Sequence, residues 1–148
     1  MCSIAWALCR ASKQWAEPTY RVAATTISQD IRSKLLQQRG QAIYLLPGAE
    51  GFEDPAGITV NLSYWIFPAF TELQQIDPTP VWEQLTQTGL ELLQTARFGR
   101  WQLPPDWLTL KSPPIISKDF SPVFGYNAIR IPLYLIWAKH EDHRTLQP

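Results

Sequence analysis

The sequence predicts an all-α fold built from helical hairpins, and three observations predict it. Apolar residues recur at helical spacing over most of the 148 residues. The predicted helices follow one another in pairs that short connections join. The chain has 13 prolines and 7 tryptophans, and the two residue types cluster in stiff loops such as residues 101–107. Paired helices with long loops at one end fit an α/α toroid or a stack of helical repeats.

The first predicted pair comprises residues 3–15 and residues 19 to about 38. Pro18 separates the two helices, because proline is tolerated in a first helical turn but not inside a helix. The connection is short, so we expect the two helices to form a hairpin. The apolar side of the first helix carries three residues at helical spacing: Ile4, Leu8 and Trp15.

A short segment with β propensity follows Gly40, where glycine suits the end of a helix. Residues 42–47 and 57–60 are short and contain β-branched and aromatic residues, and glycine, aspartate and proline lie between them. These two pieces are candidates for one small β-hairpin. The predicted fold class is therefore all-α with a single hairpin inserted in a loop.

The second predicted pair comprises residues 63–76 and 81–96, joined by the tight connection Asp-Pro-Thr-Pro. The first of these helices is strongly apolar, so we expect it to be buried. A loop over residues 97–126 follows, and a loop of this length without regular structure is often functional. The last predicted helix runs from Ala128 to about Lys139.

The composition favours a neutral ligand. Thirteen basic and 13 acidic residues leave no net charge, so the chain lacks the positive charge that binds nucleic acid or an anionic membrane surface. No apolar stretch reaches the length of a membrane-spanning helix, and residues 1–10 do not read as a signal peptide. Cys2 and Cys9 show neither a disulfide framework nor metal-ligand spacing. We expect no metal, no cofactor and no membrane insertion.

The junction between the long loop and the last helix, residues 124–130, is the first candidate site. It places Tyr126, Asn127 and Arg130 where the positive end of a helix favours an anion, a polarised water or a sugar hydroxyl. Asn127 is also a good helix N-cap, because its side-chain oxygen can accept a backbone N–H of the first turn. The residues alone leave the structural and the functional interpretation of Asn127 open.

Two loop tryptophans are the second candidate feature. Trp101 and Trp107 flank the stiff sequence Gln-Leu-Pro-Pro-Asp. Indole rings held in stiff loops suit stacking on the CH faces of sugar rings. Each tryptophan has a structural alternative, since large aromatic side chains also fill hydrophobic cores.

Four short motifs then occur in series along the chain. They are Leu-Pro-Gly with Gly-Phe at residues 46–52, Asn with Ser-Tyr at 61–64, Pro-Asp-Trp at 105–107, and Tyr-Asn-Ala-Ile-Arg at 126–130. In this order and spacing the sequence resembles glycoside hydrolase family 8 over about residues 3–138. Enzymes of that family are endo-acting, inverting hydrolases of β-1,4-glucans and related polymers, and many are the cellulases of bacterial cellulose synthesis.

The resemblance implies an incomplete (α/α)6 barrel, because the family domain is much longer than this chain. Residues 1–148 would be the central to C-terminal part of that catalytic domain, without the N-terminal region that carries the catalytic acid, a glutamate. A start directly inside an amphipathic helix agrees with this expectation. The missing half of the domain is then a partner of the chain. We expect the whole protein to be secreted or periplasmic, although residues 1–10 supply no export signal.

The resemblance also implies catalytic residues. Asn127 stands where related cellulases carry the aspartate that acts as general base, and an amide cannot take a proton. Some members with this asparagine recruit a carboxylate from the preceding loop, which makes Asp119, or else Asp106, the candidate base. Tyr64 and Arg130 resemble the cleft residues that position the water and the sugar.

Substrate-binding residues follow from the same motifs. Tyr126 resembles a residue that lines the family's cleft, and either Trp101 or Trp107 is suited to stack on a sugar ring. Asn61 and Asp106 fit the family pattern and either contact the substrate or hold loops.

Three functions agree with these features. The first is hydrolysis of cellulose-like β-1,4-glucan by the whole enzyme, with the isolated chain inactive because one catalytic carboxylate is missing and the other is displaced. The second is a non-catalytic module that binds glucan through its aromatic loops. The third is a helical scaffold that binds other proteins.

Overall fold

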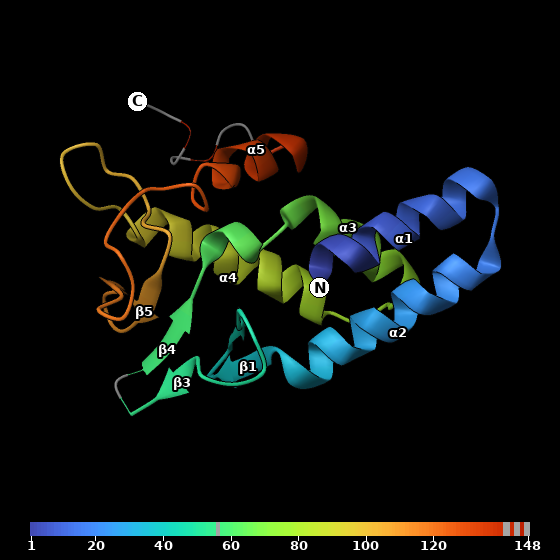
Figure 1. Ribbon diagram of the computed structural model, residues 1–148, viewed down its shortest axis with the longest axis horizontal. Coiled ribbons are helices and arrows are strands. Elements are labelled where there is room, and N and C mark those ends of the chain that lie inside the picture. The colour runs from blue at the N-terminus through green and yellow to red at the C-terminus, as the bar shows by residue number, and fades with distance from the viewer. Residues whose placement is uncertain (56, 141–142, 144–145, 147–148) are drawn as a thin grey trace.

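The protein forms paired helices flanked by two small β-sheets, as a computed structural model shows (Figure 1). The structure describes residues 1–55, 57–140, 143 and 146. Five α-helices lie in this part of the chain: α1 (Cys2–Trp15), α2 (Pro18–Lys34), α3 (Phe67–Ile76), α4 (Val81–Thr95) and α5 (Arg130–Trp137). Helix α1 packs on α2 and α3 packs on α4, so both predicted pairs are present. The mostly helical fold confirms the predicted class.

Local sequence explains the turn between α1 and α2. Ala16 ends α1 in a left-handed conformation, with a φ of 52°. Glu17 then caps α2 by accepting a hydrogen bond from the backbone N–H of Thr19 at 3.1 Å, and this bond lowers the pKa of the Glu17 carboxyl. Pro18 occupies the first turn of α2, where its missing N–H removes no helical hydrogen bond.

The buried side of α1 differs from the one that its apolar pattern suggests. Its buried residues are Cys2, Ala5 and Cys9, whereas Ile4 and Trp15 are exposed. Helix α1 contacts both α2 and α3, and small side chains let helix axes approach closely. Size as well as hydrophobicity therefore decides which side of this helix is buried.

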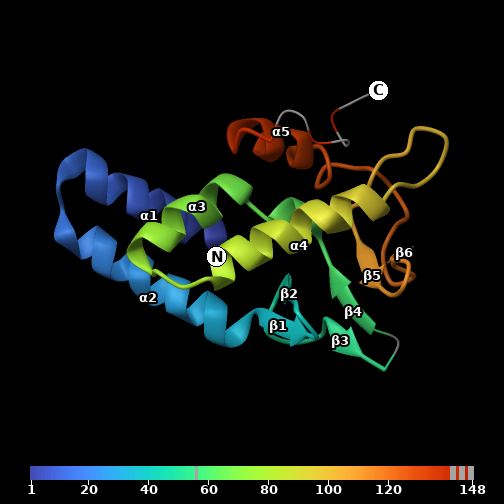
Figure 2. The same cartoon turned by 180° about the vertical axis from the view of Figure 1, so that it is seen from behind.

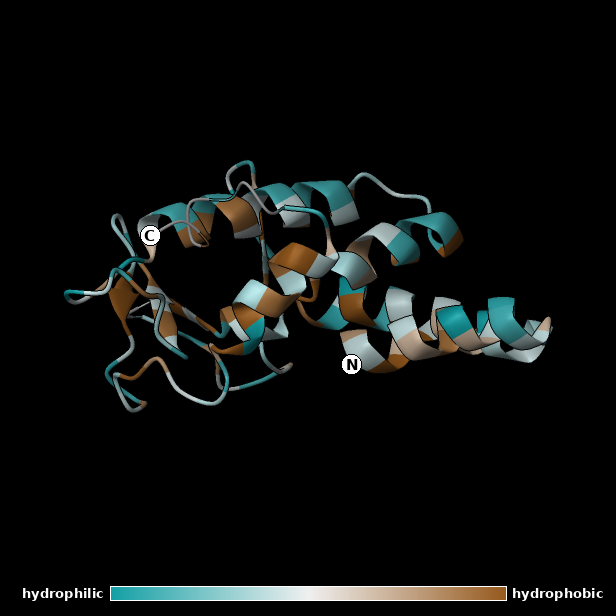
Figure 3. Ribbon diagram, turned by 90° about the horizontal axis from the view of Figure 1, so that it is seen from above, coloured by the Kyte–Doolittle hydropathy of each residue, from teal (hydrophilic) through white to brown (hydrophobic). Residues whose placement is uncertain are grey.

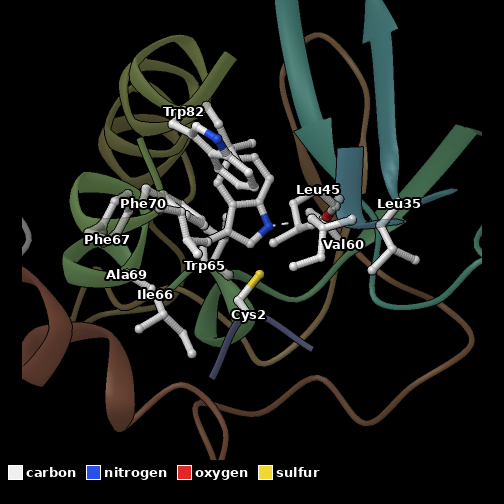
Figure 4. Packing of buried hydrophobic residues seen from close by; sticks show 14 of the residues in the cluster. Cys2, Leu35, Leu45, Val60, Trp65, Ile66, Phe67, Ala69, Phe70 and Trp82 are labelled. Carbon is white, nitrogen blue, oxygen red and sulfur yellow. Dashed lines mark hydrogen bonds between the residues drawn. The ribbon is translucent and has the colours of Figure 1, made fainter. Parts of the chain in front are cut away.

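The hydrophobic core centres on Trp65, which follows the short 3-10 helix η1 (Leu62–Tyr64) (Figure 4). The Trp65 ring is fully buried, and its indole N–H donates to the carbonyl oxygen of Leu45 at 3.2 Å. Phe70 and Trp82 stack beside it with ring centroids 6.0 Å apart. Gly89 of α4 leaves room for this packing, because a Cβ there would lie 2.7 Å from the Trp65 ring.

Two strands replace the end of the second predicted helix. Helix α2 stops at Lys34, and β1 (Leu36–Arg39) pairs antiparallel with β2 (Ala42–Leu45) across a turn in which Gly40 has a φ of 62°. The prediction that this helix reaches residue 38 is wrong. A short apolar run fits a helix or a strand equally well, and here the cross-strand partners decide.

A four-stranded sheet replaces the predicted single hairpin. Its order is β3-β4-β5-β6, and all its pairs are antiparallel. Residues 42–47 therefore do not pair with residues 57–60. The strands are β3 (Glu53–Asp54), β4 (Gly57–Val60), β5 (Leu108–Leu110) and β6 (Ile115–Ile116). The views in Figure 1 and Figure 2 place this sheet at the end of the molecule opposite the α1–α2 turn.

Helix α5 carries an exposed apolar surface. Hydrophilic and hydrophobic segments both occur along the helices (Figure 3). Four exposed residues, which we call the α5 stripe, lie on one side of α5 at helical spacing: Ile129, Leu133, Ile136 and Trp137. None of the helices in the described ranges combines the length and the hydropathy that a membrane crossing needs.

Candidate active site

The junction before α5 is built around a buried aspartate. Asp106 is 8% exposed, and its Oδ1 accepts hydrogen bonds from the backbone N–H groups of Gly125 at 2.9 Å and Ala128 at 2.8 Å. Helix α5 begins at Arg130 without a side-chain cap. Of the two interpretations left open for Asn127, the N-cap is therefore wrong, because Asp106 accepts the free N–H groups of the junction from 22 residues earlier in the chain.

Asn127 instead links a carboxylate to a cation. Its Oδ1 accepts a hydrogen bond from Nη2 of Arg130 at 2.8 Å, and its Nδ2 donates to Oδ2 of Asp106 at 3.5 Å. An amide suits this place because it accepts and donates at the same time. A carboxylate at this position would place a second negative charge beside Asp106. The structure thus holds Asn127 between Asp106 and Arg130.

Arg130 and Tyr64 meet at the wall of one cavity. Nη2 of Arg130 also donates to Oγ of Ser63 at 3.0 Å, and Cζ of Arg130 lies 5.7 Å from the centre of the Tyr64 ring. Both side chains line a cavity of about 280 Å³. Folding therefore brings Tyr64, Asn127 and Arg130 together from segments that are far apart in the sequence.

The cavity is lined by both polar and apolar side chains. Ser63 and Tyr134 line it with Arg130 and Tyr64, and Leu45 and Leu46 are among its apolar residues. Its volume is close to the lower end of the range for small-molecule sites, about 300 Å³. A phenol and a guanidinium can both donate to a water molecule or to sugar hydroxyls. The cavity is thus suited to a small neutral ligand with several hydroxyl groups.

Asn61 lies behind the cavity wall. It is 1% exposed, and its Oδ1 accepts hydrogen bonds from the backbone N–H of Ser63 at 3.1 Å and from the Ser63 hydroxyl at 2.6 Å. Its Nδ2 is buried and has no hydrogen-bond partner among the described residues. The Asn61 side chain is therefore connected to the cavity through Ser63, and the Asp106 side chain through Asn127 and then Arg130.

Four rings beside the cavity form what we call the aromatic cluster: Phe52, Tyr64, Trp107 and Phe120. Phe120 stacks on Trp107 with ring centroids 3.9 Å apart and 9° between the planes. Phe52 lies parallel to Trp107 at 6.0 Å, and Tyr64 meets Trp107 edge-on at 6.1 Å. Rings of the protein thus cover Trp107. Sequence reasoning missed Phe120 and gave Phe52 no role, although the Gly-Phe motif contains it.

Three predicted residues are exposed and do not line this cavity. Trp101 is 70% exposed and lies under the guanidinium of Arg100, 4.1 Å from its ring centre, beside a separate groove. Tyr126 is 89% exposed. Asp119 is exposed on the loop that carries Phe120, so the loop places it next to the aromatic cluster.

Cys2 also lines the cavity, and burial raises the pKa of its thiol to about 11. The thiol is therefore uncharged at neutral pH and is a poor nucleophile. Within the described ranges, no three side chains of His, Cys, Asp or Glu are grouped in a way that could hold a metal ion.

Comparisons with known proteins give matches over nearly the whole chain. The model of the glycosyl hydrolases family 8 matches residues 2–147. The chain is 37% identical over 138 residues to a probable endoglucanase of Novacetimonas hansenii, a match that covers 91% of the chain and 40% of that protein. It is 34% identical over 145 residues to an endoglucanase of Cellulomonas uda, covering 97% of the chain and 40% of the relative. The chain thus spans about 40% of the length of these curated relatives.

Solved structures share the fold. An endo-beta-1,4-glucanase of Acetobacter xylinum, CMCax, matches with a TM-score of 0.88 and 36% identity over 93% of the chain and 44% of that structure. The endoglucanase of Komagataeibacter sucrofermentans matches with a TM-score of 0.90 and 36% identity over 99% of the chain and 46% of that structure. The helical pairs of this chain therefore correspond to part of an (α/α)6 barrel, as predicted.

Proposed function

The chain belongs to the glycosyl hydrolases family 8, and from this premise we propose that residues 1–148 are part of an endoglucanase catalytic domain. The proposed reaction is inverting hydrolysis of cellulose-like β-1,4-glucan. Tyr64 and Arg130 hold the attacking water and the sugar, and Tyr126 lies at the rim of the cleft. The observation that carries the proposal is that Tyr64 and Arg130 line one cavity and that Asn127 holds Arg130 from behind through a hydrogen bond.

Arg130 suits this role because its charge is permanent and one end of its guanidinium is fixed. Nη2 is occupied by Ser63 and Asn127, and none of the described residues accepts from Nη1. Nη1 and the hydroxyl of Tyr64 are therefore the donors left for a ligand.

The general base is the next part of the proposed machinery. Inversion needs two carboxyl groups about 6.5–9.5 Å apart with a water molecule between base and sugar. Asn127 cannot take a proton, and Oδ1 of Asp106 already accepts two backbone N–H groups. Asp119 is exposed on the loop that covers Trp107. We therefore assign the base role to Asp119 in the whole enzyme.

The exposed α5 stripe supports the proposal that further helices of the family domain cover this face. Four large apolar side chains in a row on one helix are unusual on the free surface of a monomer. The missing half of the domain is the proposed partner, and it would supply the catalytic acid. We also propose that the whole protein acts outside the cytoplasm, because a cellulose-like polymer cannot cross a membrane.

Binding and hydrolysis by the 148-residue chain test the proposal. We expect titration calorimetry to detect binding of cellohexaose, and we expect Arg130→Ala to abolish it. Arg100→Ala is the matched control, because Arg100 stacks on Trp101 outside the cavity. We expect no release of reducing ends from carboxymethylcellulose. Release that Arg130→Ala abolishes would overturn the prediction of inactivity, and failure of cellohexaose to bind would overturn the proposed site.

A non-catalytic glucan-binding module is the second candidate, and Asn127 favours it because an amide stands at the place of the base. A chimera decides between the two, in which this chain replaces the matching segment of the Novacetimonas hansenii enzyme. Hydrolysis by the chimera that Asp119→Asn removes supports the hydrolase. A folded chimera that binds cellohexaose and hydrolyses glucan only after Asn127→Asp supports the binding module.

A further inference from the structure

We propose that Ser63 and Asn61 are positioning residues that fix the guanidinium of Arg130 toward the cavity. The link runs from Asn61 through the hydroxyl of Ser63 to Nη2 of Arg130, with distances of 2.6 Å and 3.0 Å. The geometry of this link is independent of the ligand. Its consequence for glucan binding rests on the proposed function.

The direction of each hydrogen bond in this link is determined. A backbone N–H can only donate, so the Asn61 atom that faces the N–H of Ser63 at 3.1 Å must be the side-chain oxygen. That oxygen can only accept, so the Ser63 hydroxyl donates its hydrogen to it. A lone pair of Ser63 Oγ is then left for Arg130. The asparagine therefore makes Ser63 an acceptor, which is what a guanidinium needs.

The two hydrogens of Nη2 have separate partners. One is directed to Ser63 Oγ and the other to Asn127 Oδ1 at 2.8 Å. The two acceptors come from η1 and from the junction before α5, so they hold the guanidinium from two sides. Held in this way, Arg130 lines the cavity together with Tyr64, with its Cζ 5.7 Å from the centre of the Tyr64 ring.

The hydrogen bond between Ser63 and Asn61 is shielded from solvent, because both residues are buried. Ser63 and Tyr64 are also neighbours in η1. The short helix η1 thus positions both the Tyr64 ring and the Ser63 hydroxyl that holds the Arg130 guanidinium.

Nuclear magnetic resonance of the Arg130 guanidinium tests the inference without any ligand. We expect resolved Nη signals in the wild-type chain, because the two hydrogen bonds hinder rotation about the Nε–Cζ bond. Ser63→Ala removes one of them, and we expect the rotation to accelerate until the signals merge. Ser33→Ala, an exposed serine on α2, is the matched control and should leave the Arg130 signals unchanged. Unchanged rotation in Ser63→Ala would overturn the inference.

Cellohexaose affinity gives the second readout. We expect Ser63→Ala to weaken binding about tenfold, since a hydrogen bond to a charged group is lost. Ser63→Cys replaces the hydroxyl with a thiol, which is a weak acceptor, so we expect a rate of rotation about the Arg130 Nε–Cζ bond between those of the wild type and Ser63→Ala. This variant tests the inference if Ser63→Ala does not fold. Faster rotation in Ser63→Ala together with no cellohexaose binding by the wild type would uphold the positioning link and reject the proposed function.

Discussion

The helical pairs and the region around α5 are held together by different interactions. In the helical pairs, neighbours in the chain pack on each other, and their contacts are mainly buried apolar side chains. Around α5, Ile131 and Leu135 also join the core, but the junction before the helix is held by hydrogen bonds between distant segments, such as the bond between Ser63 and Arg130, 67 residues apart. Packing is spread over many side chains, whereas the site depends on a few. Single substitutions should therefore act globally in the first region and locally in the second.

Trp65→Ala should have the largest effect and tests the first half of this comparison. The ring is fully buried at the centre of the core, so we expect a loss of about 3–5 kcal/mol in the free energy of unfolding. Urea unfolding followed by circular dichroism measures it. Trp15→Ala is the control, because Trp15 is exposed on α1, and its cost should stay below about 1 kcal/mol. Equal costs for the two variants would show that the core is not organised around Trp65.

Asp106→Ala tests the second part of the comparison, that a substitution around α5 acts locally. It leaves the backbone N–H groups of Gly125 and Ala128 without their acceptor, and we expect a cost of about 2 kcal/mol. Hydrogen exchange should become faster at these two amides and remain unchanged in α1 and α4. Asp119→Ala, on the exposed part of the preceding loop, should change stability by less than about 0.5 kcal/mol. Faster exchange throughout the chain would mean that the junction and the helical pairs unfold as one unit.

The same difference explains what could be predicted from the sequence. Helix α4 was predicted almost to the residue, because its apolar period and its flanking prolines are local signals. The pairing of β4 with β5 was not, because a strand's partner cannot be read from its own residues. The two interpretations of Asn127 could not be separated for the same reason: the local pattern allows a cap, and the carboxylate of Asp106 that takes this role lies 22 residues away.

The candidate site shows a further limit of prediction from the sequence. The family motifs marked Tyr64, Asn127 and Arg130, and the structure places them beside one cavity. Ser63 was part of a motif but had no predicted role, because the sequence does not show that its hydroxyl contacts Arg130. The roles of these residues in catalysis stay predictions. The stacking partner of Trp107 also depends on the path of a long loop, which has no periodic signal.

Gly89→Ala sharpens the comparison with a smaller change in the core. The new Cβ would lie 2.7 Å from the Trp65 ring and 2.8 Å from the Phe67 ring. Overpacking costs about 1–3 kcal/mol, and the better helix propensity of alanine returns about 1 kcal/mol, so we expect a net loss of about 1 kcal/mol in urea unfolding. Gln84→Ala, exposed on the same helix, should be neutral. A stabilised Gly89→Ala would show that the Trp65 packing can shift without cost.

Phe120→Ala should have the smallest effect on stability, about 1 kcal/mol or less, because the ring is 37% exposed and its main contact is the stack on Trp107. Its local effect should be clear, since it uncovers one side of Trp107. We expect acrylamide to quench tryptophan fluorescence more strongly in this variant. Phe124→Ala is the matched control, because Phe124 is 39% exposed on the same loop and makes no ring contact with Trp107 among the described residues.

The affinity of the Phe120→Ala variant for cellohexaose then separates two roles of the loop. If Phe120 occupies the place of a sugar ring, its removal frees the indole face and binding becomes tighter. If the outer face of Phe120 is itself the surface on which the sugar stacks, binding becomes weaker. One aromatic stacking contact of about 1 kcal/mol corresponds to a roughly fivefold loss of affinity. Phe124→Ala should change neither the acrylamide quenching nor the affinity for cellohexaose. An equal response of both variants would mean that the loop moves as a whole, and the stack on Trp107 would then have no separate part in the site.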